Sequence, residues 1–371
     1  MVVNTVPVSA GQARDALAAG FAVQMAGGMT ASWMLHGRPG IGKTEIVAGL
    51  AEATGSRLFD LRLTTIEPQD LRGLPYYDHD ERKTVWYRPE DLPDDPAQPA
   101  VLFLDELTAA APTLQPTVYG LLQERRVGRH LLPANVFIVA AGNTVEDGAI
   151  AYDMGTALSD RLIHLLIRAD AADWIARYAQ PVGLHPAVIA FIRTRPDLLE
   201  TTEAAMRRGD TIACTPRSWA RASAILTAHP DRALRNILLA GVLGEAAAAE
   251  FALVADDILA TVQVDEMLRA GPRARVALYP ASMHGLTALV YGLVACDRDN
   301  VPGAIDIMAE LRLLATLRPE PAFARMPLAE LCTHGFEMLI RRALEAGWQE
   351  SFLSSKAYAA YAAERRAAGL E

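Results

Sequence analysis

The chain has 371 residues, enough for two or three domains, and an ordinary globular composition: 51% hydrophobic, 21% charged and 6% aromatic. Its formal net charge of −9 disfavours a surface built to neutralise nucleic-acid phosphates. Its cysteines, Cys214, Cys296 and Cys332, are scattered and lack C-x-x-C spacing, which disfavours disulfides and a cysteine-bound zinc and fits a reducing compartment.

No apolar run predicts a membrane span. A helix that crosses a bilayer needs about 20 apolar residues. Residues 285–296 are too few, and residues 237–255 carry Glu245 and Glu250. The N-terminal residues lack the basic start and apolar stretch of a signal peptide, so we expect a soluble, cytoplasmic protein.

Between residues 31 and 168, short apolar runs alternate with amphipathic helical patterns. The runs are residues 32–37, 57–63, 100–106, 135–143 and 161–167. Strands that are apolar on both faces are typical of a parallel sheet covered by helices on both sides. The alternation therefore predicts an α/β domain built on a five-stranded parallel sheet.

Two segments with polar tips, residues 76–87 and 126–133, interrupt this alternation, and each is expected to form a hairpin. From about residue 185 the pattern is helical, with Pro and Gly at its breaks. We expect three domains, which are an α/β domain over 1–180, a helical domain over 181–270 and a helical extension over 271–371.

Residues 36–47, "HGRPGIGKTEIV", contain G-x-x-x-x-G-K-T between an apolar strand and a helical pattern. Glycines allow consecutive backbone N–H groups to face phosphate oxygens, and the helix adds the positive end of its dipole. Lys43 would bridge the β- and γ-phosphates, and the Thr44 hydroxyl would bind Mg²⁺; the alternative is a simple Gly-rich turn. The residues expected to bind ATP are Gly37, Arg38, Pro39, Gly40, Ile41, Gly42, Lys43, Thr44 and Glu45.

Polar side chains end the third and fourth apolar runs. Asp105 and Glu106 follow "VLFL"; Asp105 would hold Mg²⁺, and Glu106 would orient and deprotonate the attacking water. Asn143 ends the next run, where its amide could align that water. If Lys43 is left out of consideration, the acidic pair is more simply interpreted as a solvated strand end, and Asn143 as a capping or turn residue.

The segment "CTPRSW" predicts a helix start, with Thr215 as N-cap and Pro216 as the first helical residue. Arg217 then lies at the positive end of the helix dipole, where a cation is unfavourable unless an anion is near. A nucleotide phosphate would supply that anion. The alternative is a surface arginine paired with an acid.

Arg161 precedes the last predicted strand, at the edge of the sheet opposite the glycine-rich loop. An arginine that cannot reach its own nucleotide could reach that of a neighbouring subunit and act in trans. Arg125 and Arg126, at the end of a predicted helix, compete for this role, although cations at that place also interact favourably with the helix dipole.

These motifs, in this order, resemble those of the MoxR branch of the AAA+ ATPases over about residues 10–230. The glycine-rich loop and the acidic pair are shared by many ATPases. The resemblance is also carried by "DLRGLPYYD", "TPRSW", residues 102–143 and "EDGAIAYDMGTALSDRL" at 146–162. Of these, residues 102–143 and 146–161 are far more specific to the MoxR branch.

The resemblance implies a helical lid over about residues 185–270 and assembly into a ring, usually a hexamer. It also implies a partner with a von Willebrand A domain, with which the ATPase remodels or matures a client protein. The implied site roles are phosphate binding by Lys43 and Thr44, Walker B by Asp105 and Glu106, sensor 1 by Asn143, and sensor 2 by Arg217.

Two other functions compete with an ATP-driven remodelling ring. A nucleic-acid motor or loader uses the same core, but it predicts a basic stripe, and here acids outnumber the dispersed Lys and Arg by 44 to 35. A nucleotide-gated binding module with negligible turnover would not need the catalytic set of Asp105, Glu106 and Asn143.

Overall fold

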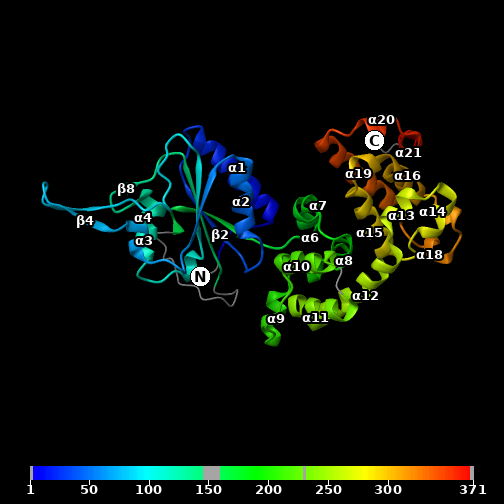
Figure 1. Ribbon diagram of the computed structural model, residues 1–371, viewed down its shortest axis with the longest axis horizontal. Coiled ribbons are helices and arrows are strands. Elements are labelled where there is room, and N and C mark those ends of the chain that lie inside the picture. The colour runs from blue at the N-terminus through cyan, green and yellow to red at the C-terminus, as the bar shows by residue number, and fades with distance from the viewer. Residues whose placement is uncertain (1–2, 145–158, 229–230, 368–371) are drawn as a thin grey trace. The chain divides into compact units, whose positions relative to one another are not determined.

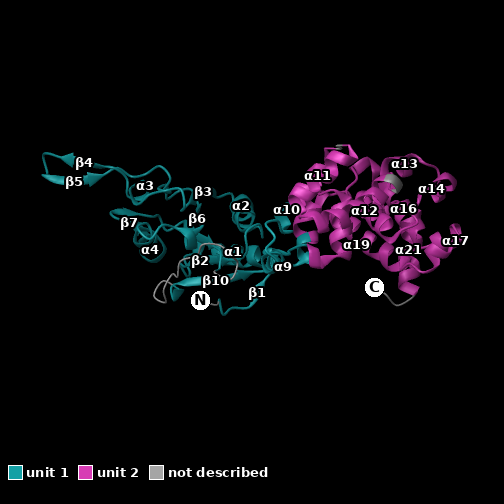
Figure 2. Cartoon of the chain, turned by 90° about the horizontal axis from the view of Figure 1, so that it is seen from below, with its two compact units in different colours: residues 1–174, 199–218 teal, residues 175–198, 219–371 magenta. Residues whose placement is uncertain are grey.

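The computed structural model describes residues 3–144, 159–228 and 231–367. By packing, the chain divides into two compact units, coloured separately in Figure 2. Unit 1 comprises residues 1–174 and 199–218, and unit 2 comprises residues 175–198 and 219–371. Unit 1 contains every residue predicted to bind or cleave a nucleotide.

Unit 1 is built on a six-stranded, all-parallel sheet in the order β1-β10-β2-β9-β6-β3 (Figure 1). The strands are β1 (Pro7–Val8), β2 (Ser32–His36), β3 (Arg57–Arg62), β6 (Ala100–Asp105), β9 (Val136–Gly142) and β10 (Leu162–Ile167). The five predicted strands are confirmed, but the predicted number of five is wrong because β1 adds a sixth. A strand of two residues carries no periodic pattern, so the sequence contains no signal for it.

Helices cover both faces of this sheet, as Figure 1 shows for α1 and α2 on one side and α3 and α4 on the other. In the part of unit 1 that the structure describes, the helices are α1 (Ala10–Met25), α2 (Lys43–Ala53), α3 (Pro68–Arg72), η1 (Leu107–Ala109), α4 (Gln115–Glu124), α6 (Ala171–Trp174) and α9 (Thr202–Arg208). Alternate strand residues enter opposite cores, as period 2 requires. Leu35 and Phe103 pack with α1 and α2, whereas Met34 and Leu102 pack with α4.

The parallel register decides which loops meet. Because all strands run the same way, the loops that follow β2, β3, β6 and β9 leave at the same, carboxyl edge of the sheet. Leu162 pairs with Ser32 and Leu166 with His36, so β10 begins at the opposite, amino edge. Arg161, directly before β10, therefore lies a full strand length from the glycine-rich loop.

The two predicted hairpins are confirmed. They are formed by β4 (Pro75–Asp78) with β5 (Lys83–Trp86), and by β7 (Arg126–Val127) with β8 (His130–Leu131). Figure 1 shows the β4–β5 hairpin projecting away from the sheet. It carries exposed aromatic rings, since Tyr77 is 74% and Tyr87 63% exposed.

Among its described residues, unit 2 contains helices and the turns that join them but no strand, as the helical pattern from about residue 185 predicts. Its helices are η3 (a π-helix, Ile175–Ala179), α7 (Gln180–Val182), α8 (Pro186–Thr194), η4 (Pro196–Leu198), α10 (Pro216–Thr227, which begins in unit 1), α11 (Arg232–Leu243), α12 (Glu245–Thr261), α13 (Val264–Arg269), α14 (Pro272–Leu278), α15 (Met283–Val294), η5 (Arg298–Asn300), α16 (Val301–Leu311), α17 (Leu314–Leu317), α18 (Pro321–Ala324), α19 (Leu328–Ala346), α20 (Glu350–Leu353) and α21 (Lys356–Ala367). Among the described residues, none of these helices combines the length and apolar character that a bilayer crossing demands.

An aromatic cluster joins three helices of unit 2. Phe191, Trp219 and Phe251 are almost fully buried, with ring centroids 5.1–5.4 Å apart. The Trp219 indole N–H donates to the carbonyl of Leu198 at 2.8 Å, so its one polar group is satisfied. This cluster fixes α8, α10 and α12 to one another.

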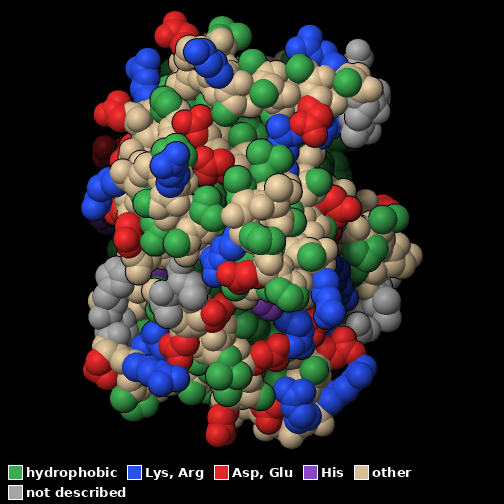
Figure 3. Space-filling model, turned by 90° about the vertical axis from the view of Figure 1, so that its right-hand side faces the viewer, with side chains coloured by type: hydrophobic (Ala, Val, Ile, Leu, Met, Phe, Trp, Pro, Cys, Tyr) green, Lys and Arg blue, Asp and Glu red, His purple; other side chains and the backbone are tan. Residues whose placement is uncertain are grey.

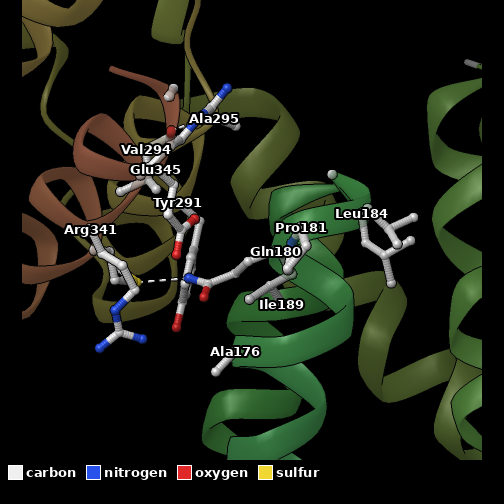
Figure 4. Close-up of a pocket in the computed structure, with 15 residues that line it drawn as sticks. Ala176, Gln180, Pro181, Leu184, Ile189, Tyr291, Val294, Ala295, Arg341 and Glu345 are labelled. Atoms are coloured by element: carbon white, nitrogen blue, oxygen red, sulfur yellow. Dashed lines mark hydrogen bonds between the residues drawn. The ribbon is translucent and has the colours of Figure 1, made fainter. Parts of the chain in front are cut away.

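A pocket of about 510 Å³ opens within unit 2 between residues 176–189 and helices α15 and α19 (Figure 4). The Gln180 side chain extends across it, and its Nε2 donates to Met338 Sδ at 2.7 Å. None of the residues predicted to bind nucleotide lines this pocket.

Replacing Phe251 by Ala should destabilise unit 2 by about 3–5 kcal/mol, because it opens a cavity among rings that cannot fully collapse. The matched control is Leu253→Ala on the same helix, where a side chain 72% exposed should change the free energy of unfolding by less than about 0.5 kcal/mol. Urea unfolding followed by circular dichroism measures both. Equal losses for the two variants would contradict the cluster's role.

Candidate nucleotide-binding site

The glycine-rich loop has the backbone that its sequence predicts. Gly40 and Gly42 adopt φ of +79° and +104°, in the left-handed region that favours glycine. Gly42 is also the N-cap of α2, so Lys43 and Thr44 form its first turn. The loop thus ends at a helix N-terminus, where backbone N–H groups and the helix dipole favour an anion.

Lys43 joins the loop to the neighbouring strand. Its ammonium donates to the carbonyls of Gly37 at 2.5 Å and Arg38 at 3.2 Å, and to Asn143 Oδ1 at 2.9 Å. Asn143 follows β9, the strand that pairs with β2. The structure therefore brings two of the predicted site residues, 100 positions apart, into direct contact.

Asn143 is fixed by a reciprocal pair of hydrogen bonds. Its N–H donates to Thr108 Oγ1, and the Thr108 hydroxyl donates to the Asn143 carbonyl, both at 3.1 Å. Thr108 lies in η1, directly after the acidic pair. The loops that follow β6 and β9 are thereby held together behind the site.

Asp105 is the last residue of β6 and is only 9% exposed. Burial raises the pKa of the Asp105 carboxyl, and the nearby Glu106 carboxylate raises it further. Three groups lower this pKa: the Glu106 N–H, which donates to Asp105 Oδ1 at 2.9 Å, and the cations of Lys43 and Arg62. The net effect is a raised pKa. A buried carboxylate whose charge is incompletely compensated by the protein is a suitable ligand for a cation. Asp105 and the Thr44 hydroxyl provide the oxygen donors that Mg²⁺ prefers.

Glu106 has a left-handed backbone (φ 59°, ψ 33°), which is rare for a residue with a side chain and typical of strained functional positions. The Thr64 hydroxyl donates to Glu106 Oε2, and Arg62 Nε lies 3.9 Å from Glu106 Oε1. Thr64 follows β3 and was not predicted as a site residue. Its contact with Glu106 follows from the order of the strands, because β3 lies beside β6 in the sheet.

Arg38 connects the loop to a distant segment. Its guanidinium forms ion pairs with Glu200 at 2.5 Å and Glu203 at 3.0 Å. The Arg38 and Glu200 side chains are 15% and 13% exposed, so this pair is poorly screened by water. The two partners lie 162 and 165 positions along the chain, and no local pattern marks them.

The same segment also packs against the loop through Thr215 and Arg217. The Arg217 N–H donates to the Gly40 carbonyl at 3.2 Å, and a Cβ on Gly40 would come within 2.8 Å of Thr215 Oγ1. Thr215 caps α10 as predicted, because its Oγ1 accepts the N–H of Ser218 at 3.1 Å. The Arg217 side chain is exposed and forms no ion pair with any residue that the structure describes, so the paired-surface interpretation has no support.

The three candidate trans arginines differ in availability. Arg125 Nη2 donates to the carbonyls of Pro133 at 3.0 Å and Val136 at 2.5 Å, and burial lowers its pKa, so it is engaged inside unit 1. Arg126 is exposed and lies 3.6 Å from Glu124. Arg161 is exposed at the amino edge and donates to Gln123 Oε1.

Of the predicted residues, the structure thus brings Lys43, Asp105, Glu106 and Asn143 to the carboxyl edge with the glycine-rich loop, and places Arg161 at the opposite edge. The predicted family segment at residues 146–162 lies mostly outside the described residues.

Comparison with known proteins agrees with this geometry. Residues 32–162 match the family model of the AAA domain, dynein-related subfamily. With its parallel sheet and the helices that follow, the chain has the AAA+ P-loop NTPase fold, which confirms the predicted fold class. No curated protein matches the chain.

Solved structures give weaker likenesses. An ATPase described as putative, from Cytophaga hutchinsonii, is 15% identical over 88% of this chain and 81% of that one, with a TM-score of 0.32. A RuvB mutant from Thermotoga maritima is 14% identical over 92% and 89%, with a TM-score of 0.35. At such identities and TM-scores these likenesses show nothing about activity.

Replacing Asp105 by Asn should make the nucleotide-free protein more stable at about pH 7. The folded pKa of Asp105 lies above the ordinary 3.8, so its carboxylate costs stability above the folded pKa, and the cost fades as pH falls towards 3.8. Asn carries no charge, so the advantage of the variant should shrink as pH is lowered. Urea unfolding across this range measures it, and the exposed Asp80→Asn is the control.

Replacing Gly40 by Ala should weaken both stability and ATP binding. A left-handed alanine costs about 1–2 kcal/mol in itself, and here its Cβ would also collide with Thr215. Gly55→Ala is the matched control, since its φ is +63° but nothing lies within 4 Å of the added Cβ. Urea unfolding and ATP titration compare them. Equal losses would show that the contact with Thr215 is unimportant.

Proposed function

We propose that this AAA+ ATPase hydrolyses ATP within a ring and uses the cycle to remodel or mature a client protein. The observation that carries the proposal is the meeting of Lys43, Asp105, Glu106 and Asn143 at the carboxyl edge of the sheet. A phosphate-binding ammonium and a pair of carboxylates at one edge provide the groups needed for phosphoryl transfer to water.

Hydrolysis would use this chain's own groups as follows. Backbone N–H groups of residues 40–44 and the Lys43 ammonium hold the β- and γ-phosphates. Glu106 accepts a proton from the attacking water, while the Asn143 amide fixes the water's direction. The Thr64 hydroxyl holds the Glu106 carboxylate beside the site. Mg²⁺, bound through Thr44 and Asp105, would neutralise phosphate charge.

Arg161 is proposed to complete the site of a neighbouring subunit. It lies at the opposite edge of the sheet from its own glycine-rich loop, so it cannot contact its own nucleotide. A head-to-tail ring brings the surface of one subunit to the nucleotide of the next. Because Arg125 is already bonded to carbonyls of its own unit, Arg161 is the better candidate.

The finer proposal is a MoxR-type ATPase that forms a hexamer and works with a protein carrying a von Willebrand A domain. It is supported by the sequence resemblance stated above. The domain division at residues 1–180, 181–270 and 271–371 stays a prediction, and sensor 2 is assigned to Arg217. The exposed Tyr77 and Tyr87 make the β4–β5 hairpin a candidate contact for the partner or client.

A nucleic-acid motor or loader is the alternative function, and charge argues against it. The net charge is −9, and the face drawn in Figure 3 intersperses Lys and Arg with Asp and Glu instead of gathering them in a stripe. Sequence-independent DNA binding needs such a positive track.

Two substitutions should separate binding from hydrolysis. Lys43→Ala should abolish ATP binding, because it removes the ammonium that faces the phosphates. Arg161→Ala should leave the dissociation constant of ATP nearly unchanged and lower turnover about a thousandfold or more, as loss of a trans arginine does. Isothermal titration and phosphate release measure the two effects.

Arg126→Ala tests the competing candidate, because Arg126 is also an exposed arginine. Under this proposal it should keep its turnover, and a loss of turnover in Arg126→Ala but not in Arg161→Ala would transfer the trans role to Arg126. Weaker ATP binding by Arg161→Ala would contradict a trans role. Stimulation of turnover by added DNA would favour the alternative function.

A further inference from the structure

Two histidines on neighbouring strands, the buried His36 and the half-buried His164, form a hydrogen-bonded pair in unit 1. His36 ends β2 and is 4% exposed, and His164 lies in β10. His36 Nε2 is 2.8 Å from His164 Nδ1. The ring planes are 16° apart and the centroids 5.1 Å apart, so the rings meet edge to edge in one plane, which is a good geometry for this bond.

The direction of the bonds follows from a third group. His164 Nε2 lies 2.9 Å from the carbonyl oxygen of Ser159, which can only accept, so this nitrogen carries the proton. In the neutral His164 ring, Nδ1 then accepts the N–H of His36 Nε2. The result is an ordered chain of donors that runs from His36 through His164 to Ser159.

This chain of hydrogen bonds joins two parts of unit 1 that matter for the proposed reaction, namely the glycine-rich loop and the segment that carries Arg161. His36 directly precedes Gly37, whose carbonyl accepts the Lys43 ammonium. Ser159 lies two residues before Arg161. The histidine pair therefore crosses the sheet from the glycine-rich loop to the segment that carries Arg161.

A plain core role does not account for the pair. The same face of these strands carries Met34 and Leu162, which belong to an apolar cluster. Aliphatic side chains of similar size at positions 36 and 164 would need no polar partners there. The bonds specify one arrangement of β10 and the preceding turn relative to β2.

We propose that His36 and His164 are positioning residues that link nucleotide occupancy at the glycine-rich loop to the placement of Arg161 in the same subunit. A phosphate competes with the Gly37 carbonyl for the Lys43 ammonium. Release of that carbonyl shifts the end of β2, and the histidine chain passes the shift to the turn before Arg161. The inference rests on the proposed trans role of Arg161.

The test uses mixed assemblies of two full-length variants. The Arg161→Ala subunit keeps its own groups for cleaving ATP and lacks only an arginine from its neighbour. The Glu106→Gln subunit provides that arginine, and it binds ATP without cleaving it. Neither alone should release phosphate, and a mixture should. His36→Leu or His36→Gln is then added to the Glu106→Gln subunit. Gln keeps an N–H near the Nε2 position, whereas Leu suits the apolar surroundings but cannot donate.

With His36→Leu in the arginine-supplying subunit, turnover of the mixture should fall about 2- to 30-fold. His36→Gln should restore most of it, although both variants bind ATP as tightly as their parent. If Lys43→Ala is also present in that subunit, His36→Leu should have no further effect, because there is no occupancy to transmit.

The outcomes separate the two proposals. If the mixture of Arg161→Ala and Glu106→Gln shows no turnover, the trans role of Arg161 fails, and the histidine link fails with it. If that mixture is active and the Leu variant supports turnover as well as the Gln variant, only the histidine link is overturned. The histidine link alone is also overturned if His36→Leu lowers turnover only when it is placed in the Arg161→Ala subunit, which cleaves ATP.

Discussion

The contact of the Lys43 ammonium with the Gly37 carbonyl and the Asn143 amide ties together the parts of the site that sequence keeps apart. It exists because β2 and β9 are parallel neighbours whose carboxyl ends stop at the same level. The acidic pair reaches the same place because β6 is the next strand in the sheet. The chemistry of the site is therefore a property of strand order and direction as much as of residue type.

The candidate site contains one desolvated carboxylate and one strained backbone position, side by side in the chain. Asp105 is buried enough to raise its pKa, and Glu106 adopts a left-handed backbone directly after it. Neither feature favours the folded state, and the surrounding apolar sheet has to offset both. Sites that bind charged ligands commonly accept such costs, because the ligand supplies the missing interactions.

Most of the sheet and the centre of the site could be predicted because their signals are local. Buried strands of five or more residues show continuous apolar runs, and the loop from Gly37 to Thr44 is a contiguous motif. The two-residue strand β1, the Thr64 contact with Glu106, the Arg38 ion pairs and the His36–His164 pair could not be predicted. Each depends on which strands or segments lie side by side, and a single sequence does not reveal this when the partners are 42 to 165 positions apart.

The close approach of Thr215 to Gly40 has a consequence for how the chain can be divided. Residues 199–218 follow a helical stretch, yet they group with the α/β unit, and they form one wall of the loop through Glu200, Thr215 and Arg217. A fragment cut after β10 would keep every strand but lose that wall. Recombinant pieces and chimaeras that preserve the loop's shape should therefore retain the chain through Ser218, even where a cut near residue 175 looks natural.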